Sequence, residues 1–280
     1  MPQRAWTLSA ALLFVALAAT TASPTSFPNP SCPDSVTIAQ MWNGGACMPA
    51  FGVGAMPGDT VRGVAGIVTA LDTKPESFMF YLQNRASPPA SYSGLEVFTG
   101  ELDVSQPPES FAPGDSVVVE FARTANFAGV VRAMPPNNNV PSPNIILRRV
   151  NSGNDLPALI SCTAGQLAYH APGTTLSGRL CQLVTLAGPL SVVRTNVVGA
   201  ESFLVVSSAD EADSVLVNGF QLTDVPTPDL GTDVAQVSGV FHRRTQGYEI
   251  LLRGPNDLVL SSSPTAASRR SWGALKAAYH

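Results

Sequence analysis

Residues 61–71 read VRGVAGIVTAL and decide the fold of this chain. The stretch is apolar and rich in β-branched side chains, which favours a β-strand, and Gly63 and Gly66 allow that strand to bend sharply. Further strand patterns follow at 78–83, 95–99, 117–121, 127–133 and 145–150. Short strands separated by turn residues are typical of a small antiparallel barrel or sandwich.

The second half of the chain repeats this order of strand patterns. Its candidate strands lie at 178–187, 203–206, 215–217, 237–243 and 248–252. Self-similarity at a period of about 110 residues predicts two copies of one fold rather than a solenoid. The turn-rich residues 151–157 suit a short linker. We therefore predict an all-β protein with one domain in residues 36–150 and a second in residues 151–260.

The first 22 residues have the pattern of a secretory signal peptide. Arg4 provides the positive start, 8–19 is an apolar run, and 20–22 offers small residues for cleavage. The run is shorter than the ~20 residues that span a bilayer. We expect cleavage near Ser23, no membrane span, and a secreted or periplasmic protein. Residues 23–35 would then be a lead-in, and 261–280 a basic tail that forms a linker or a short helix.

The four cysteines are Cys32, Cys47, Cys162 and Cys181. An even number in an exported chain favours disulfides, and the spacing leaves one close pair near the start of each half. The predicted bridges are Cys32–Cys47 and Cys162–Cys181, although four cysteines allow three connectivities. The sequence has no C-x-x-C and only three histidines, which argues against zinc. We expect no metal and no cofactor.

The charge balance bears on the class of partner. The chain has 16 Lys and Arg against 20 Asp and Glu, a formal net charge of −4. Proteins that bind polyanions usually do so through clustered basic side chains that displace counterions. Nucleic acid is therefore disfavoured as a partner, although a local basic groove is compatible with this balance.

Motifs of catalysis are missing from the sequence. It contains no G-x-S-x-G nucleophile motif and no phosphate-binding G-x-x-x-x-G-K. His170 stands before a probable loop and His242 at a strand end, so both are predicted to be solvated. Alternation with apolar neighbours also puts the acids of the predicted strands on the outward, solvated face: Glu96, Glu120 and Glu249. We expect a protein that is not an enzyme.

Several motifs in their order carry a resemblance that covers residues 36–260. They are 63–70 (GVAGIVTA), 81–83 (YLQ), 92–98 (YSGLEVF), 114–117 (GDSV), 178–180 (GRL) and 251–258 (LLRGPNDL). This series resembles tandem OB-fold proteins exported by bacteria, of myxobacterial type, and the OB domains that precede the catalytic domain of some secreted nucleases. The chain departs from that family at 174–177 (TTLS), where the family has a more acidic entry to the first strand. The resemblance implies two OB-like barrels and no catalytic residue.

The first repeat carries the candidate ligand face. OB-fold barrels bind oligonucleotides or oligosaccharides across strands 2 and 3, with aromatic rings as stacking platforms. Alternation puts Phe80 and Leu82 on one face of strand 78–83 and Tyr81 and Gln83 on the other. If the first face is core, the second is exposed. The predicted ligand-binding residues are Tyr81, Gln83, Arg85, Tyr92 and Phe98. The alternative is that these aromatics pack against the neighbouring domain.

The sequence therefore predicts an exported, non-catalytic binding or interaction module made of two OB-like barrels. The expected partner is an unknown protein or carbohydrate in the envelope or outside the cell. The alternative is an accessory component of an extracellular nuclease system that binds single-stranded nucleic acid.

Overall fold

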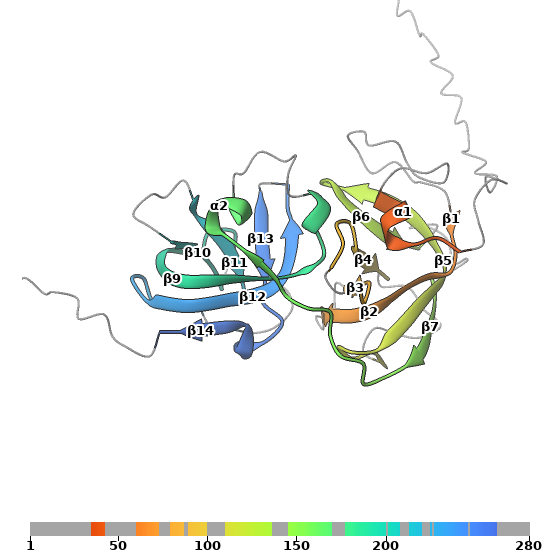
Figure 1. Ribbon diagram of the computed structural model, residues 1–280. Coiled ribbons are helices and arrows are strands. Elements are labelled where there is room, and N and C mark those ends of the chain that lie inside the picture. The colour runs from red at the N-terminus through yellow and green to blue at the C-terminus, as the bar shows by residue number, and fades with distance from the viewer. Residues whose placement is uncertain are drawn as a thin grey trace, which may run out of the picture.

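The structure is a computed structural model that describes residues 35–42, 60–72, 79–86, 89–99, 110–135, 145–169, 177–199, 201–207, 213–219, 225, 227–245 and 247–261. Its strands form two seven-stranded sheets, each closed into a barrel, and the barrels lie side by side (Figure 1). The all-β prediction of two OB-like barrels is confirmed. Residues 1–22, Cys32, Cys47, His170 and 262–280 lie outside the described residues. No helix in the described part of the chain is long and apolar enough to cross a membrane.

The first barrel contains β1 (Thr60–Val61), β2 (Val64–Leu71), β3 (Met79–Gln83), β4 (Gly94–Phe98), β5 (Ser116–Phe127), β6 (Val130–Met134) and β7 (Ile146–Asn151). The strand β2 pairs with β3 and β5, and β3 pairs with β4. A parallel pairing of β4 with β6 and an antiparallel pairing of β5 with β6 close the barrel. This closed five-stranded order is that of an OB fold.

The second barrel contains β8 (Ile160–Cys162), β9 (Leu183–Thr195), β10 (Ser202–Val206), β11 (Val215–Asn218), β12 (Asp233–Arg243), β13 (Tyr248–Leu251) and β14 (Leu258–Leu260). Here β9, β10, β11, β12 and β13 pair as β2 to β6 do in the first barrel, including the parallel pair β11–β13 and the closing pair β12–β9. The predicted internal repeat is therefore a repeat of topology.

Short helical segments complete the two units. They are α1 (Ile38–Trp42), α2 (Ala164–Leu167), and the 3-10 turns Ser177–Arg179 and Pro255–Asp257. The indole Nε1 of Trp42 donates to the carbonyl of Gly94 at 2.6 Å, which ties α1 to the first barrel. The side chain of Thr163 caps α2 by accepting from Gln166.

The stretch that decides the fold bends as its glycines predict. Gly63 has a φ of 66°, a conformation that favours glycine, and it separates β1 from β2 while both strands pair with β5. Gly66 lies against β3, where a Cβ would come within 3.0 Å of the Cβ of Leu82.

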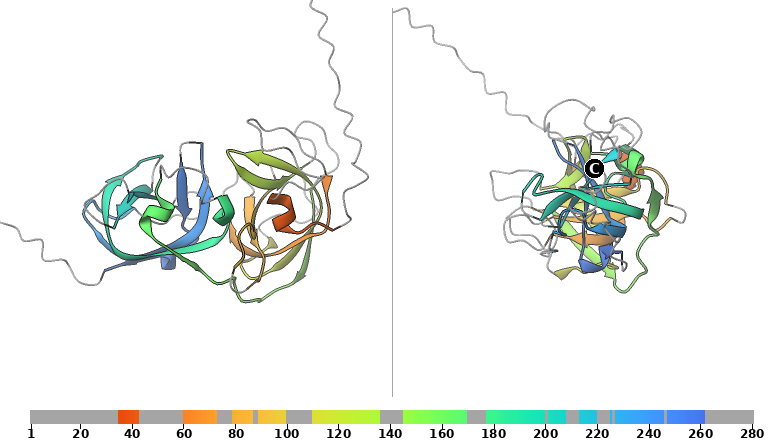
Figure 2. Two further views of the ribbon diagram at one scale, coloured as in Figure 1. Left: turned by 45° about the horizontal axis from the view of Figure 1, so that its top comes forward. Right: turned by 90° about the vertical axis from the view of Figure 1, so that its left-hand side faces the viewer.

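The main apolar core runs through both barrels. One connected cluster of buried side chains includes Phe80 and Val97 of the first barrel and Phe241 and Ile250 of the second. The left view in Figure 2 shows the two barrels adjoining. The two repeats therefore fold as neighbours with a shared interior.

The predicted disulfide Cys162–Cys181 is wrong, because both cysteines are free. Cys162 on β8 is in register with Leu186 of β9, whereas Cys181 precedes the first residue of that strand, Leu183. Leu183 and Leu186 alone are roughly 10 Å apart along a strand. A disulfide needs Cα atoms within about 7 Å. Cys181 is instead buried between the barrels, where burial raises the pKa of its thiol well above the ordinary value.

Candidate functional site at the junction of the barrels

The strand β3 faces two different interiors. Phe80 and Leu82 point into the first barrel, as predicted, and both are fully buried. Tyr81 and Gln83 point the other way, but their exposed fractions are also 0% because the second barrel covers them. The Oε1 atom of Gln83 accepts from the backbone N–H of Leu183 at 2.9 Å. The prediction that this face is exposed is wrong, and packing against the neighbouring domain is what occurs.

The other three predicted ligand residues are separated. Tyr92 is half-buried, and its backbone N–H donates to the carbonyl of Gly178 at 2.7 Å. Arg85 is exposed and pairs with Asp155 at 3.7 Å. Phe98 is half-buried, with the guanidinium of Arg132 5.8 Å from its ring centroid. The five residues therefore do not form one open face.

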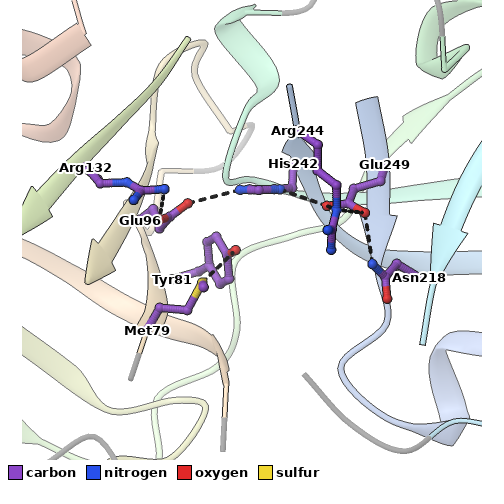
Figure 3. Close-up of polar contacts among 8 residues, drawn as sticks. All are labelled: Met79, Tyr81, Glu96, Arg132, Asn218, His242, Arg244 and Glu249. Atoms are coloured by element: carbon purple, nitrogen blue, oxygen red, sulfur yellow. Dashed lines mark hydrogen bonds and ion pairs between the residues drawn. The ribbon is translucent and has the colours of Figure 1, made fainter. Parts of the chain in front are cut away.

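A row of ionisable side chains crosses the junction in their place. On the first barrel, Arg132, Glu96 and Tyr81 are cross-strand neighbours on β6, β4 and β3. Glu96 forms an ion pair with Arg132, whose Nη2 atom lies 2.6 Å from Glu96 Oε1, and its Oε2 atom lies 3.0 Å from the Nε2 atom of His242, which belongs to the second barrel. The ring of Tyr81 meets the imidazole edge-on, with centroids 6.0 Å apart. Figure 3 shows this row passing from one barrel to the other.

The row continues on the second barrel. The Nδ1 atom of His242 lies 3.0 Å from Glu249 Oε1. Glu249 also accepts from Arg244 Nε at 2.6 Å and from Asn218 Nδ2 at 3.0 Å. The strands β12 and β13 hold these groups together, because His242 and Glu249 are opposite each other in the register. We call Glu96, Arg132, His242, Arg244 and Glu249 the junction network (Figure 3).

The charges of the junction network support one another. Burial alone would lower the pKa of His242, but the hydrogen bonds and charges of Glu249 and Glu96 raise it to about 9. Burial alone would raise the pKa of Glu96, yet His242 and Arg132 hold it below the usual value. The pKa of Glu249 is lowered in the same way, against burial, by His242 and Arg244. The histidine is therefore an imidazolium at neutral pH, held between two carboxylates.

The sequence did not reveal this site, because side chains that point out of their own barrel were expected to be exposed to water. Glu96 and Glu249 are 0% exposed and His242 is 7% exposed, so the predictions of solvated side chains are wrong for all three. Only Glu120 is partly exposed as expected, with a surface ion pair to Arg148. One signal was available in the sequence. Apart from a single polar or charged residue each, β3, β4 and β13 are nearly continuous apolar runs, as strands buried on both faces are.

The arrangement does not suit metal binding. In the part of the chain that the structure describes, no group of three or more His, Cys, Asp or Glu side chains could hold a metal ion. Both ring nitrogens of His242 are already within hydrogen-bond distance of carboxylates, which leaves neither free for a metal.

Comparison with solved structures finds several that are similar to this chain, and two of them cover most of its length. The structure of the tetrameric p202 HIN2 shares 15% identity over 75% of this chain and 94% of that chain, with a TM-score of 0.28. The structure of fission yeast Pot1 with ssDNA shares 8% identity over 82% of this chain and 91% of that chain, with a TM-score of 0.27. No protein-family model and no curated protein matches the sequence. At these TM-scores the OB assignment rests on the strand pairing of the chain itself.

Proposed function

We propose that this chain is an exported, non-catalytic binding module whose two OB-fold barrels act as one rigid unit. The observation that carries the proposal is the closure of the first barrel's β3–β4 face by the second barrel, through Tyr81, Gln83 and Glu96. OB barrels bind their ligands across these strands. In this chain the same face holds the two barrels together, so a ligand would meet a surface that both of them build.

The chemistry of the junction network supports a structural role rather than a catalytic one. A general base needs a free lone pair near neutral pH, but His242 is protonated there and sits between two carboxylates. Glu96 and Glu249 are sealed from solvent and occupied by cationic partners. These residues hold the barrels together and leave no group aimed at a substrate.

Export is part of the proposal and rests on the pattern of the first 22 residues. The leading partner is a protein or carbohydrate outside the cytoplasm. Single-stranded nucleic acid is the second candidate. It is favoured by the exposed ring of Phe127, which has Arg132 over it, and by Arg243, which lies against Gly129 of the same hairpin turn.

A binding survey of the chain from residue 23 onward tests the proposal. It would be titrated with oligosaccharides and single-stranded oligonucleotides, cross-linked to exported proteins of its source, and assayed with nuclease, glycosidase and esterase substrates. We expect saturable binding to one class and no turnover. Turnover that disappears in His242→Gln would overturn the non-catalytic assignment. If the protein bound none of these classes, the proposal that it is a binding module would be overturned.

A further inference from the structure

The turn between β5 and β6 presents an aromatic ring at the edge of the junction. Ala128 and Gly129 have φ values of 52° and 86°, as the two central residues of a type I′ hairpin turn do. The Oδ1 atom of Asn126 accepts from the N–H of Gly129 at 3.0 Å and fixes the turn. Phe127 stands at its base, opposite Val130, and is 49% exposed. A large apolar ring on a tight, two-residue turn is held out to solvent in a defined position.

Arg132 fixes one side of that ring. Its guanidinium carbon lies 4.5 Å from the centroid of Phe127 and 5.8 Å from that of Phe98, while its Nη2 is bound to the buried Glu96. The ion pair immobilises the arginine, and the arginine in turn supports the exposed phenyl ring. Phe127 therefore offers a stacking surface with little side-chain entropy left to lose.

The second barrel supplies a cation to the same edge. Arg243, at the end of β12, reaches the hairpin turn so closely that a Cβ added at Gly129 would lie 2.5 Å from its Nη1 atom. Its guanidinium also lies over the ring of Tyr248 at 5.5 Å. Among the described residues, Arg243 makes no ion pair with a carboxylate. A guanidinium without a counter-charge among the described residues thus lies against the hairpin turn of the other barrel, two residues along the chain from the exposed Phe127.

These observations select a class of ligand. An exposed ring with a second arginine at the same turn offers stacking for a planar base and a guanidinium for a phosphate. Single strands are held without base-specific contacts in this way. We propose that Phe127, Arg132 and Arg243 form a short binding site for single-stranded nucleic acid at the junction of the barrels. One base stacks on Phe127 and the adjoining phosphate lies on Arg243. This inference rests on the proposed binding module and places its ligand away from the covered β3–β4 face.

The test is a fluorescence anisotropy titration of the chain from residue 23 onward with a labelled oligothymidylate of about 12 nucleotides, at low and moderate salt. We expect Phe127→Ala to weaken binding by about 10-fold or more, because one stacked base is lost. Arg243→Gln should weaken binding and lower the slope of log K against log salt by about one. The duplex of the same sequence should bind less well, since its bases are already stacked.

Two matched controls separate the site from general effects. Arg148→Gln removes the same unit of charge from an arginine already paired with Glu120, and Leu230→Ala trims another exposed apolar side chain. Both should bind within twofold of the unaltered protein. If the oligothymidylate does not bind at low salt, or if Phe127→Ala and Arg243→Gln bind it as the controls do, the proposed nucleic-acid site is refuted. The binding module would then still stand if an oligosaccharide or protein bound, and would fall only if no class bound.

Discussion

Replacing Glu96 by Gln removes one charge from the centre of the junction network and keeps the shape of the side chain. Glu96 is 0% exposed and holds Arg132 at 2.6 Å and His242 at 3.0 Å. Removing one partner of a buried ion pair costs about 3–5 kcal/mol, because the remaining charge stays buried. His242 keeps its contact with Glu249, and the side chain of Arg132 is 15% exposed, so some compensation remains. We therefore expect a loss near the lower end, about 3 kcal/mol.

Urea unfolding and thermal unfolding at pH 7 would measure this loss. For a protein of this size about 3 kcal/mol corresponds to a fall in Tm of roughly 6–12 °C. Glu120→Gln is the matched control, because Glu120 forms its ion pair with Arg148 at the surface, where such pairs contribute about 0–1 kcal/mol. The double variant Glu96→Gln/His242→Gln should lose less than the sum of the two single variants. If Glu96→Gln were no more destabilising than Glu120→Gln, the junction network would not hold the barrels together.

Three further predictions concern the same region. The pKa of His242 is raised from 6.5 to about 9 in the folded protein, so its contribution, on the order of 3 kcal/mol, is complete below pH 6.5 and is lost as the pH rises through 9. Urea unfolding between pH 6 and 10 should show this decline, and His242→Gln should abolish it; a flat profile for the unaltered protein would contradict it. Gly94→Ala should destabilise the fold by about 1–3 kcal/mol, because its Cβ would collide with the backbone of Cys181, whereas Gly254→Ala enters open space and should be neutral in thermal unfolding. Alkylation followed by mass spectrometry should label half-buried Cys162 in the native protein and Cys181 only after denaturation, and a peptide linking the two would refute the assignment of free thiols.

Local sequence patterns predicted short strands in a small antiparallel barrel or sandwich, and the resemblance to tandem OB-fold proteins implied the barrels. The glycines at 63 and 66, the alternation in β3 and the turn residues before β5 are short-range signals, and each marks the feature it predicts. The same period of two also separated Phe80 and Leu82 from Tyr81 and Gln83 correctly. The alternation along a strand therefore predicts whether a side chain points into its own barrel or out of it.

The environment beyond the barrel could not be predicted in this way. Glu96 and His242 are 146 residues apart, and no local pattern relates them. An outward side chain meets water on a free barrel and another protein surface on a packed one, and both have the same alternation. The disulfide predicted from the spacing of the cysteines was wrong for a similar reason. A short separation in sequence says nothing about whether the parallel pairing of β8 with β9 carries Cys162 away from Cys181.

The junction network explains why the barrels keep one orientation. A purely apolar interface could slide, since burial is non-directional. Here His242 contacts a carboxylate from each barrel, and the side chain of Gln182 donates to the carbonyl of Ala90 and to the Oγ atom of Ser93, each at 2.9 Å. Rotation of either barrel would leave these groups buried without partners, which costs more than the rotation could recover. The fixed orientation keeps the hairpin turn that carries Phe127 against Arg243 of the other barrel, as the proposed two-barrel site requires.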